Sequence, residues 1–244
     1  MKYIEKVVIG DCTLYHADCM DVMPFIDKVD AVVTDPPFEK EAHSSIRRTQ
    51  KSITNKTVDI INFEMINEDL RDFISKWSNK NSKGWNLFFC QCEAVAAWRD
   101  SIEKFDGKYK RACIWVKPDS SPQFNGQGPA QGYESIVCSW SGEGVSRWNG
   151  GGKRGVFTHL TNTKDREGTH PTEKPIRLMN ELVNLFTFKN DLILDPFMGS
   201  GTTGVACVKM GRKFIGIELD KQYFDISCGR IRDAYAQPDM FIND

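Results

Sequence analysis

Short runs of apolar residues alternate along this chain with longer segments whose apolar residues recur at helical spacing. In the segment 67–78, the apolar side chains follow i, i+3, i+4, i+7 spacing, which places them on one face of a helix. They are Leu70, Phe73, Ile74 and Trp77. Alternation of apolar runs with amphipathic helices is typical of a mainly parallel sheet with helices on both faces. The sequence therefore predicts an α/β fold.

The same pattern predicts a sheet of seven strands. The predicted strands are Cys12–His16, Val29–Thr34, Asn86–Cys90, Arg111–Val116, Ser135–Ser139, Leu192–Leu194 and Phe214–Ile217. The predicted helices are Asp21–Phe25, Asn67–Ser78, Glu93–Lys104, Pro175–Phe186, Thr202–Met210 and Gln222–Ala234. A chain of 244 residues that carries these elements fits one domain, residues 1–244.

Two segments break this rhythm. Residues 39–57 are polar and lack periodicity, and the stretch 119–168 is rich in Gly, Ser, Asn and Gln. Long irregular stretches inside a compact α/β unit are usually functional or disordered. We expect 39–57 to be a contact loop and about 141–169 to be a small recognition insertion, both ordering on a partner.

Charge is distributed unevenly along the chain. The formal net charge is only −1, but residues 39–56 hold five Lys or Arg against two Glu, and residues 145–166 hold five against one Asp. Two basic segments on an otherwise acidic body suit a protein that meets a polyanion along one face. Solvated loops with incidental lysines are the alternative.

Cysteine and histidine positions argue against a metal site. The eight cysteines include no C-x-x-C pair, and the four histidines are scattered, so a zinc site at Cys90 and Cys92 would lack two ligands. The chain shows no signal peptide and no apolar run of about 18 residues. We therefore expect a cytoplasmic protein with reduced thiols, no metal and no membrane contact.

The most informative motif, Asp35-Pro36-Pro37-Phe38, directly follows the predicted strand 29–34. Proline fixes φ and lacks an N–H, so the backbone carbonyls here act only as acceptors, and residues before proline are held extended. A flat amino group would find acceptors in the Asp35 carboxylate and the Pro36 carbonyl. Phe38 would supply a face for the ring that carries this amine. An ordinary strand-ending turn is the alternative.

A second motif joins a strand, a glycine turn and a helix. The predicted strand 192–194 runs into residues 195–204, Asp-Pro-Phe-Met-Gly-Ser-Gly-Thr-Thr-Gly. Glycines let a ligand approach the backbone, and the N–H groups at the start of the helix at Thr202 could bind a carboxylate or phosphate. Glu218, after the next strand, could accept hydrogen bonds from both ribose hydroxyls.

These glycines leave an oxidoreductase open as an alternative. Gly199, Gly201 and Gly204 match G-x-G-x-x-G, with Glu218 following at a suitable distance for a nicotinamide cofactor. This spacing alone is weak evidence. The Asp195 carboxylate at the mouth of the loop would repel pyrophosphate, whereas it suits the ammonium of a cofactor that bears an amino acid.

A third motif, His170-Pro171-Thr172-Glu173-Lys174-Pro175, precedes the helix 176–186. Proline suits the first turn of a helix, so a simple loop-to-helix cap is one reading. Thr172 and Lys174 could alternatively hold a carboxylate.

Together these motifs resemble the permuted, beta-type amino-methyltransferases that act on exocyclic amines of DNA bases. The catalytic Asp-Pro-Pro-Tyr/Phe, the His-Pro-Thr-Gln/Glu-Lys-Pro segment and the Asp-Pro-Phe-x-Gly-Ser-Gly-Thr-Thr loop occur in that family's order, from about residue 12 to 230. The resemblance implies a Rossmann-like fold with circularly permuted motifs. Glu173 stands where Gln is frequent. A non-catalytic nucleic-acid-binding relative would be expected to have damaged motifs, and these are intact.

The cofactor implied by this resemblance is S-adenosylmethionine. Asp195, Phe197 and the glycines would line its methionine end, Thr172 and Lys174 its carboxylate, Glu218 its ribose and Asp18 its adenine. The complete set of expected cofactor residues is Asp18, Asp35, Thr172, Lys174, Asp195, Phe197, Gly199, Ser200, Gly201, Thr202 and Glu218.

The resemblance implies direct methyl transfer to N6 of an adenine that has left the duplex stack. Asp35, Pro36, Pro37 and Phe38 would form the catalytic corner, with Phe38 stacking on the flipped base. Cytosine-N4 members usually carry Ser at the Asp35 position, so Asp35 favours adenine. Cytosine-N4 and RNA adenine-N6 methylation stay open, as do a homodimer and a place in a restriction system, a phage or a regulatory pathway.

Recognition of the DNA sequence would fall to the two irregular segments. Arg147, Trp148, Asn149, Lys153 and Arg154 combine base-reading, stacking and phosphate-binding side chains in the insertion. In the loop 39–57, Arg47, Arg48 and Lys51 would assist. We therefore expect a recognition sequence of only a few base pairs.

Overall fold

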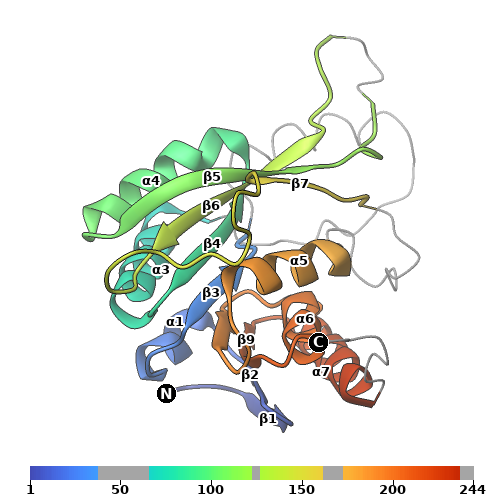
Figure 1. The fold of residues 1–244 in the computed structure, drawn as a ribbon. Coiled ribbons are helices and arrows are strands. Elements are labelled where there is room, and N and C mark those ends of the chain that lie inside the picture. Colours follow the sequence, from blue (N-terminus) through green and yellow to red (C-terminus); the bar gives the residue numbers. More distant parts are fainter. Residues whose placement is uncertain (38–65, 123–126, 162–172, 237–244) are drawn as a thin grey trace.

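The computed structural model describes residues 1–37, 66–122, 127–161 and 173–236, and they form a three-layer α/β structure (Figure 1). The strands are β1 (Glu5–Ile9), β2 (Cys12–His16), β3 (Ala31–Thr34), β4 (Trp85–Cys90), β5 (Lys108–Val116), β6 (Tyr133–Trp140), β7 (Val156–Thr158), β8 (Leu192–Asp195) and β9 (Lys213–Glu218). The helices are α1 (Cys19–Val22), α3 (Glu68–Asn81), α4 (Val95–Lys104), α5 (Ile176–Phe186), α6 (Thr202–Lys209) and α7 (Lys221–Ala236). Short 3-10 turns cover Met23–Phe25 and Cys92–Ala94.

The strands form a single mixed sheet in the order β1-β2-β9-β8-β3-β4-β6-β5-β7. Pairing is parallel from β2 to β4 and again between β5 and β7. The predicted count of seven strands is wrong, because nine occur among the described residues. Both missed strands are sheet edges: β1 is largely exposed, and β7 has three residues, of which only Phe157 is buried. Neither gives a strong apolar signal.

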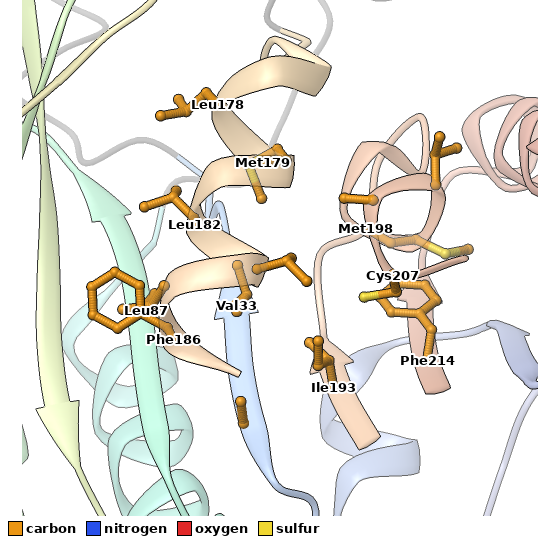
Figure 2. Close-up of a cluster of buried hydrophobic side chains, with 14 of the residues drawn as sticks. Val33, Leu87, Leu178, Met179, Leu182, Phe186, Ile193, Met198, Cys207 and Phe214 are labelled. Carbon is orange, nitrogen blue, oxygen red and sulfur yellow. The ribbon is translucent and has the colours of Figure 1, made fainter. Parts of the chain in front are cut away.

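Helices cover both faces of the sheet, as the sequence predicted. Neighbouring residues of each central strand point to opposite faces: Val33 packs with α5 and α6, and Val32 packs with α3 and α4. Figure 2 shows Leu178 and Leu182 of α5 directed towards the face that carries Val33. The other core is centred on Trp98, whose ring stacks on Phe88 at a centroid distance of 4.6 Å. Two buried faces make the central sheet rigid.

The predicted helix 67–78 is observed as α3. Its N-cap is Asn67, whose side chain accepts a hydrogen bond from the Leu70 amide, and Ile74 and Trp77 are buried. Acidic residues in the first turn also complement the helix dipole. The sequence pattern therefore identified both the start and the buried face of this helix.

The order of the strands reverses between β3 and β8. From β3 the chain crosses through α3 to β4 on one side, and from β8 it crosses through α6 to β9 on the other side. Because α3 packs on one face of the sheet and α6 on the other, the chain leaves the carboxyl ends of β3 and β8 in opposite directions. In open α/β sheets, ligands bind at such a switch point.

One hydrogen bond links the two strands at this point. The Thr34 hydroxyl at the end of β3 donates to Oδ1 of Asp195 at the end of β8, over 2.7 Å, and both side chains are buried. Burial raises the pKa of Asp195 to about 6, despite hydrogen bonds from Thr34 and Thr203 that favour its ionised form. The bond therefore stabilises the fold most when Asp195 is ionised.

Thr34→Val should lower the free energy of unfolding by about 1–3 kcal/mol at pH 7.5, because an ionised, buried carboxylate loses a donor. The raised pKa means that burying ionised Asp195 costs stability as the pH rises through about 6, and the Thr34 donor offsets part of that cost, so Thr34→Val should be more damaging at pH 7.5 than at pH 5. Urea unfolding at pH 7.5 and pH 5 measures both values, with Thr13→Val in β2 as the control. An equal loss at the two pH values would contradict this account.

Candidate active site

The carboxyl ends of four neighbouring parallel strands carry four carboxylates. Asp18 follows β2, Glu218 ends β9, Asp195 ends β8 and Asp35 follows β3. These strands are adjacent in that order, so the four acidic residues lie along one edge of the sheet. The sequence predicted all four as site residues, and sheet topology brings them to the same edge.

Asp35 lies at the tip of β3 with its side chain 29% exposed. Its Oδ2 accepts a hydrogen bond of 2.6 Å from the Lys174 ammonium. Burial raises the pKa of Asp35, and Glu134 adds to this rise, whereas Lys174 opposes it. Pro36 is buried beside it. Phe38 lies outside the described residues, so its stacking role stays a prediction.

Lys174 itself is buried between two carboxylates. Its Nζ lies 2.6 Å from Asp35 Oδ2 and 3.0 Å from Glu134 Oε1, over the face of the Phe89 ring. Burial lowers the pKa of Lys174, but the two carboxylates raise it above the usual value for a lysine, so it stays charged. Its predicted contact with a cofactor carboxylate stays a prediction.

Two charged residues beside this site were missed in the sequence. Glu134 of β6 is 5% exposed, and its Oε2 accepts a 2.6 Å hydrogen bond from Lys117, which follows β5. Both lie just outside the predicted strands 111–116 and 135–139. A charged residue that borders an otherwise apolar strand was the available signal.

The glycine loop after β8 has the conformation that its sequence predicts. Gly199 and Gly201 have positive φ angles of 51° and 83°. A Cβ on Gly201 would lie 2.7 Å from the Ser227 Cβ, whereas one on Gly199 would meet no described atom within 4 Å. Gly201 is thus required for packing against α7, and the backbone at Gly199 leaves room for a ligand.

Asp195 ties this loop to its surroundings. Its Oδ1 accepts from Thr34 and the Phe197 amide, and its Oδ2 accepts a 2.7 Å hydrogen bond from Thr203. Asp195 is only 2% exposed. The Asp195 carboxylate therefore holds the glycine loop in place. This structural role does not depend on the predicted contact between Asp195 and the cofactor.

Glu218 and Asp18 both lie at strand tips beside the glycine loop. Glu218 accepts a 2.9 Å hydrogen bond from the Gly199 amide and a 2.7 Å bond from the Asp220 amide. Burial raises the pKa of Glu218 to about 7. Asp18 is exposed and caps α1 through the Met20 amide.

A buried ion pair links the segment before α5 to this loop. Arg230 of α7 lies 2.5 Å from Glu173 and donates to the Ser200 carbonyl and hydroxyl and to the Thr202 hydroxyl. Glu173 and Arg230 are each 8% exposed. Glu173, noted in the sequence only as a departure from a frequent Gln, therefore has a charged partner. Thr172 lies outside the described residues.

Two of the residues predicted to contact DNA, Trp148 and Asn149, lie against helix α5. Trp148 packs on Phe186 of α5, and the Asn149 amide donates to the carbonyls of Asn184 and Thr187, completing the end of α5. Because β6 runs antiparallel to β4, the chain after Trp140 leaves the sheet at the end of the strands opposite to the end that carries Asp35. Helix contacts alone account for Trp148 and Asn149, and their predicted role in reading bases stays untested.

The remaining predicted DNA contacts divide into two groups. Arg147 and Arg154 are exposed, and Lys153 is paired with Glu181 of α5. Arg47, Arg48 and Lys51 lie outside the described residues.

The described residues contain no cluster of three His, Cys, Asp or Glu side chains that could hold a metal ion. All eight cysteines have free thiols. Within the same part of the chain, no helix has the length and apolar character needed to cross a membrane.

The sequence matches the model of the N6/N4 DNA methylase family over residues 29–228. It is 27% identical over 251 aligned positions to type II methyltransferase M2.LlaDCHI of Lactococcus lactis subsp. cremoris, covering 94% of this chain and 91% of the relative. These spans include all three motifs found in the sequence.

Solved structures agree with this match. The M1.HpyAVI complex with S-adenosylmethionine has a TM-score of 0.69 and 27% identity, covering 90% of this chain and 98% of that one. The cytosine-N4-specific PvuII DNA methyltransferase shares the fold, with a TM-score of 0.70, 16% identity, and coverage of 96% and 95% of the two chains. The nicotinamide-dependent alternative is therefore wrong.

Strand order, glycine loop and acidic strand tips thus agree with the matches to known proteins: the chain belongs to the N6/N4 DNA methylase family and is an S-adenosylmethionine-dependent DNA methyltransferase.

Proposed function

We propose that the protein methylates N6 of an adenine flipped out of a short duplex DNA sequence, with Asp35 as the catalytic acceptor for the amine. The observation that supports this most is the position of Asp35 at the switch point, one strand away from the glycine loop. A base amine held at Asp35 would meet a cofactor held at Gly199 across two adjacent strand tips.

The exocyclic amine needs this help because its lone pair is delocalised into the ring. Two acceptors on its N–H bonds favour a pyramidal nitrogen and stabilise the positive charge that develops as the N–C bond forms. Lys174 occupies Oδ2 of Asp35, so Oδ1 and the Pro36 carbonyl are the proposed acceptors. Aligned acceptors of this kind can contribute about 3 kcal/mol in the transition state.

S-adenosylmethionine would supply the electrophilic methyl group: the N–C bond forms as the S–C bond breaks, the sulfonium leaves as a neutral thioether, and the methylated amine then loses one proton to solvent. For this chain, we propose that the glycine loop and Phe197 hold its methionine end, that Glu218 accepts from its ribose hydroxyls and that Asp18 accepts from its adenine amine. The room at Gly199 and the edge that Glu218 and Asp18 share support this arrangement. Lys174 and Thr172 are proposed near the methionine carboxylate.

Adenine is favoured over cytosine by one residue type. Cytosine-N4 enzymes among the beta-type amino-methyltransferases usually carry Ser at the position of Asp35, whereas this chain has a carboxylate at that position. Cytosine-N4 is the second candidate, since the family includes both activities. The names of the bacterial relatives support a place in a restriction system.

Asp35→Ala should reduce methyl transfer at least about 100-fold, because the amine loses its charged acceptor. Transfer of tritiated methyl groups to PCR-made duplex DNA of several kilobases, which carries no modified base, measures this. S-adenosylmethionine affinity, from calorimetric titration, should change little, and the half-exposed Asp21→Ala serves as control. Retained turnover in Asp35→Ala would defeat the proposal.

The product distinguishes the two candidate bases. Enzymatic digestion of the methylated DNA to nucleosides, followed by mass spectrometry, should yield N6-methyladenosine in its deoxy form. Appearance of N4-methylcytosine instead would assign the second candidate and leave the methyltransferase activity itself intact.

Cofactor affinity should depend on the protonation of Glu218. Its pKa in the free protein is raised to about 7, and only the ionised form is a full acceptor for ribose hydroxyls. Affinity should therefore fall between pH 8 and pH 6, by up to about ten-fold per unit below the pKa. Glu218→Gln should remove this dependence; an identical pH profile in that variant would exclude the role.

Arg230→Met should weaken S-adenosylmethionine binding by about ten-fold, because it leaves Glu173 buried without its cation and releases Ser200 and Thr202. Glu173→Gln, which keeps an acceptor for Arg230, should have a much smaller effect. Titration at a temperature where both variants are folded, as judged by circular dichroism, provides the test. Equal affinity in the wild type and Arg230→Met would show that the ion pair does not shape the loop.

A further inference from the structure

Four charged side chains of alternating sign form a row of ion pairs that begins at the tip of β3. They run from Asp35 to Lys174, then to Glu134 and finally to Lys117, and successive contacts are 2.6, 3.0 and 2.6 Å. Asp35 is the partly exposed end, Lys174 and Glu134 are buried, and Lys117 is 22% exposed. The chain of charges has a net charge of zero, so each member determines how strongly its neighbours attract one another.

We propose that Glu134 is a positioning residue for methyl transfer: it competes with Asp35 for the ammonium of Lys174 and so keeps the Asp35 carboxylate available to the base amine. This inference rests on the proposed function of Asp35. Neither Glu134 nor Lys117 belongs to the three sequence motifs.

The geometry supports competition rather than simple pairing. Lys174 donates a hydrogen bond to Asp35, whereas its contact with Glu134 is an ion pair at 3.0 Å. Without a second anion, a buried lysine would concentrate its charge on Asp35 and weaken it as an acceptor. Glu134 attracts the same ammonium from the other side, so the ammonium interacts less strongly with Asp35.

The outer cation, Lys117, acts in the opposite sense. It donates to Oε2 of Glu134 and lies over the Trp115 ring, with Nζ 4.4 Å from the ring centroid. By satisfying Glu134 from the far side, Lys117 weakens the hold of Glu134 on Lys174. Removing Lys117 should therefore strengthen the Glu134–Lys174 contact and relax the contact of Lys174 with Asp35.

Charges on every neighbouring element must be considered for Asp35. Lys174 lies before α5, Glu134 on β6, Lys117 after β5 and Asp195 on β8. Burial and Glu134 raise the pKa of Asp35, and Lys174 and Lys117 lower it. Asp195 adds a negative charge from the adjacent strand. The two distal residues thus affect the acceptor with opposite signs.

Because Glu134 and Lys117 affect the Asp35 carboxylate with opposite signs, their substitutions should have opposite effects on the pH profile, which a purely structural role would not produce. The single-turnover rate of methyl transfer is measured against pH on PCR-made duplex DNA at saturating S-adenosylmethionine. Glu134→Gln should move the acid limb to lower pH and Lys117→Gln should move it to higher pH, each by about one unit or less. At neutral pH, Glu134→Gln should also slow transfer by about ten-fold or more, because added positive charge opposes the developing charge on the amine.

Matched controls come from the opposite edge of the sheet. Lys108→Gln changes the first residue of β5, the strand that Lys117 follows, and Glu103→Gln changes an exposed residue near the end of α4. Both should retain the wild-type profile. Calorimetric titration with S-adenosylmethionine counts folded, competent sites in every variant, so rates refer to those sites alone.

Three outcomes separate the proposals. Opposite shifts in Glu134→Gln and Lys117→Gln, with slower transfer in the former, support the positioning role. Shifts of the same sign, or no shifts, overturn the positioning role of Glu134. If Asp35→Ala is inactive at the same time, the proposed function of Asp35 still holds. Activity in Asp35→Ala overturns the proposed function itself, whatever the pH profiles of the other variants.

Discussion

The parallel pairing of β3 with β8 is the constraint on which the site depends. It places Asp35 and the glycine loop on adjacent strand tips, although 160 residues separate Asp35 from Asp195 in the sequence. Among the described residues, α3 and α6 pack on opposite faces of the sheet after these strands. The Thr34–Asp195 hydrogen bond then fixes the two tips relative to one another. The topology of the sheet therefore brings the two motifs together, before any side chain contributes chemistry.

Local patterns in the sequence predicted much of this arrangement, and long-range pairing was beyond their reach. Helix α3 was recognisable because Asn67 caps it and its apolar residues share one face. Lys174 belongs to a sequence motif, but its contact with Glu134 joins residues 40 positions apart, and no local pattern pairs them. The edge strand β7 was missed because only Phe157 of its three residues is buried, and one buried residue gives no readable pattern before the pairing with β5 is known. Sequence motifs therefore predicted Asp35, Lys174 and the glycine loop as site residues, but they missed Glu134 and Lys117, the two charges that follow Lys174.

In the insertion after β6, residue type alone does not separate a structural role from a role in recognition. Trp148 and Asn149 were grouped with Arg147 because tryptophan can stack on bases and asparagine can read adenine. In the structure, Trp148 and Asn149 complete the end of α5, where an indole ring covers Phe186 and an amide satisfies two terminal carbonyls. Helix ends leave unpaired carbonyls that must find donors, and this requirement competes with any role in recognition. The structure shows that these two side chains meet the first requirement, and their role in recognition stays a prediction.

Electrostatics also explains why this loop suits a cationic cofactor. Four carboxylates share one sheet edge, and burial raises the pKa of both Asp195 and Glu218, which shows that negative charge is costly there. A ligand that brings positive charge relieves this cost, whereas a pyrophosphate would increase it. The sulfonium and ammonium groups of S-adenosylmethionine are both positive, and the base amine gains positive charge as it reacts. On the proposed function, the same acidic edge would favour the cofactor in the ground state and the amine in the transition state, so that binding and chemistry would use one electrostatic field.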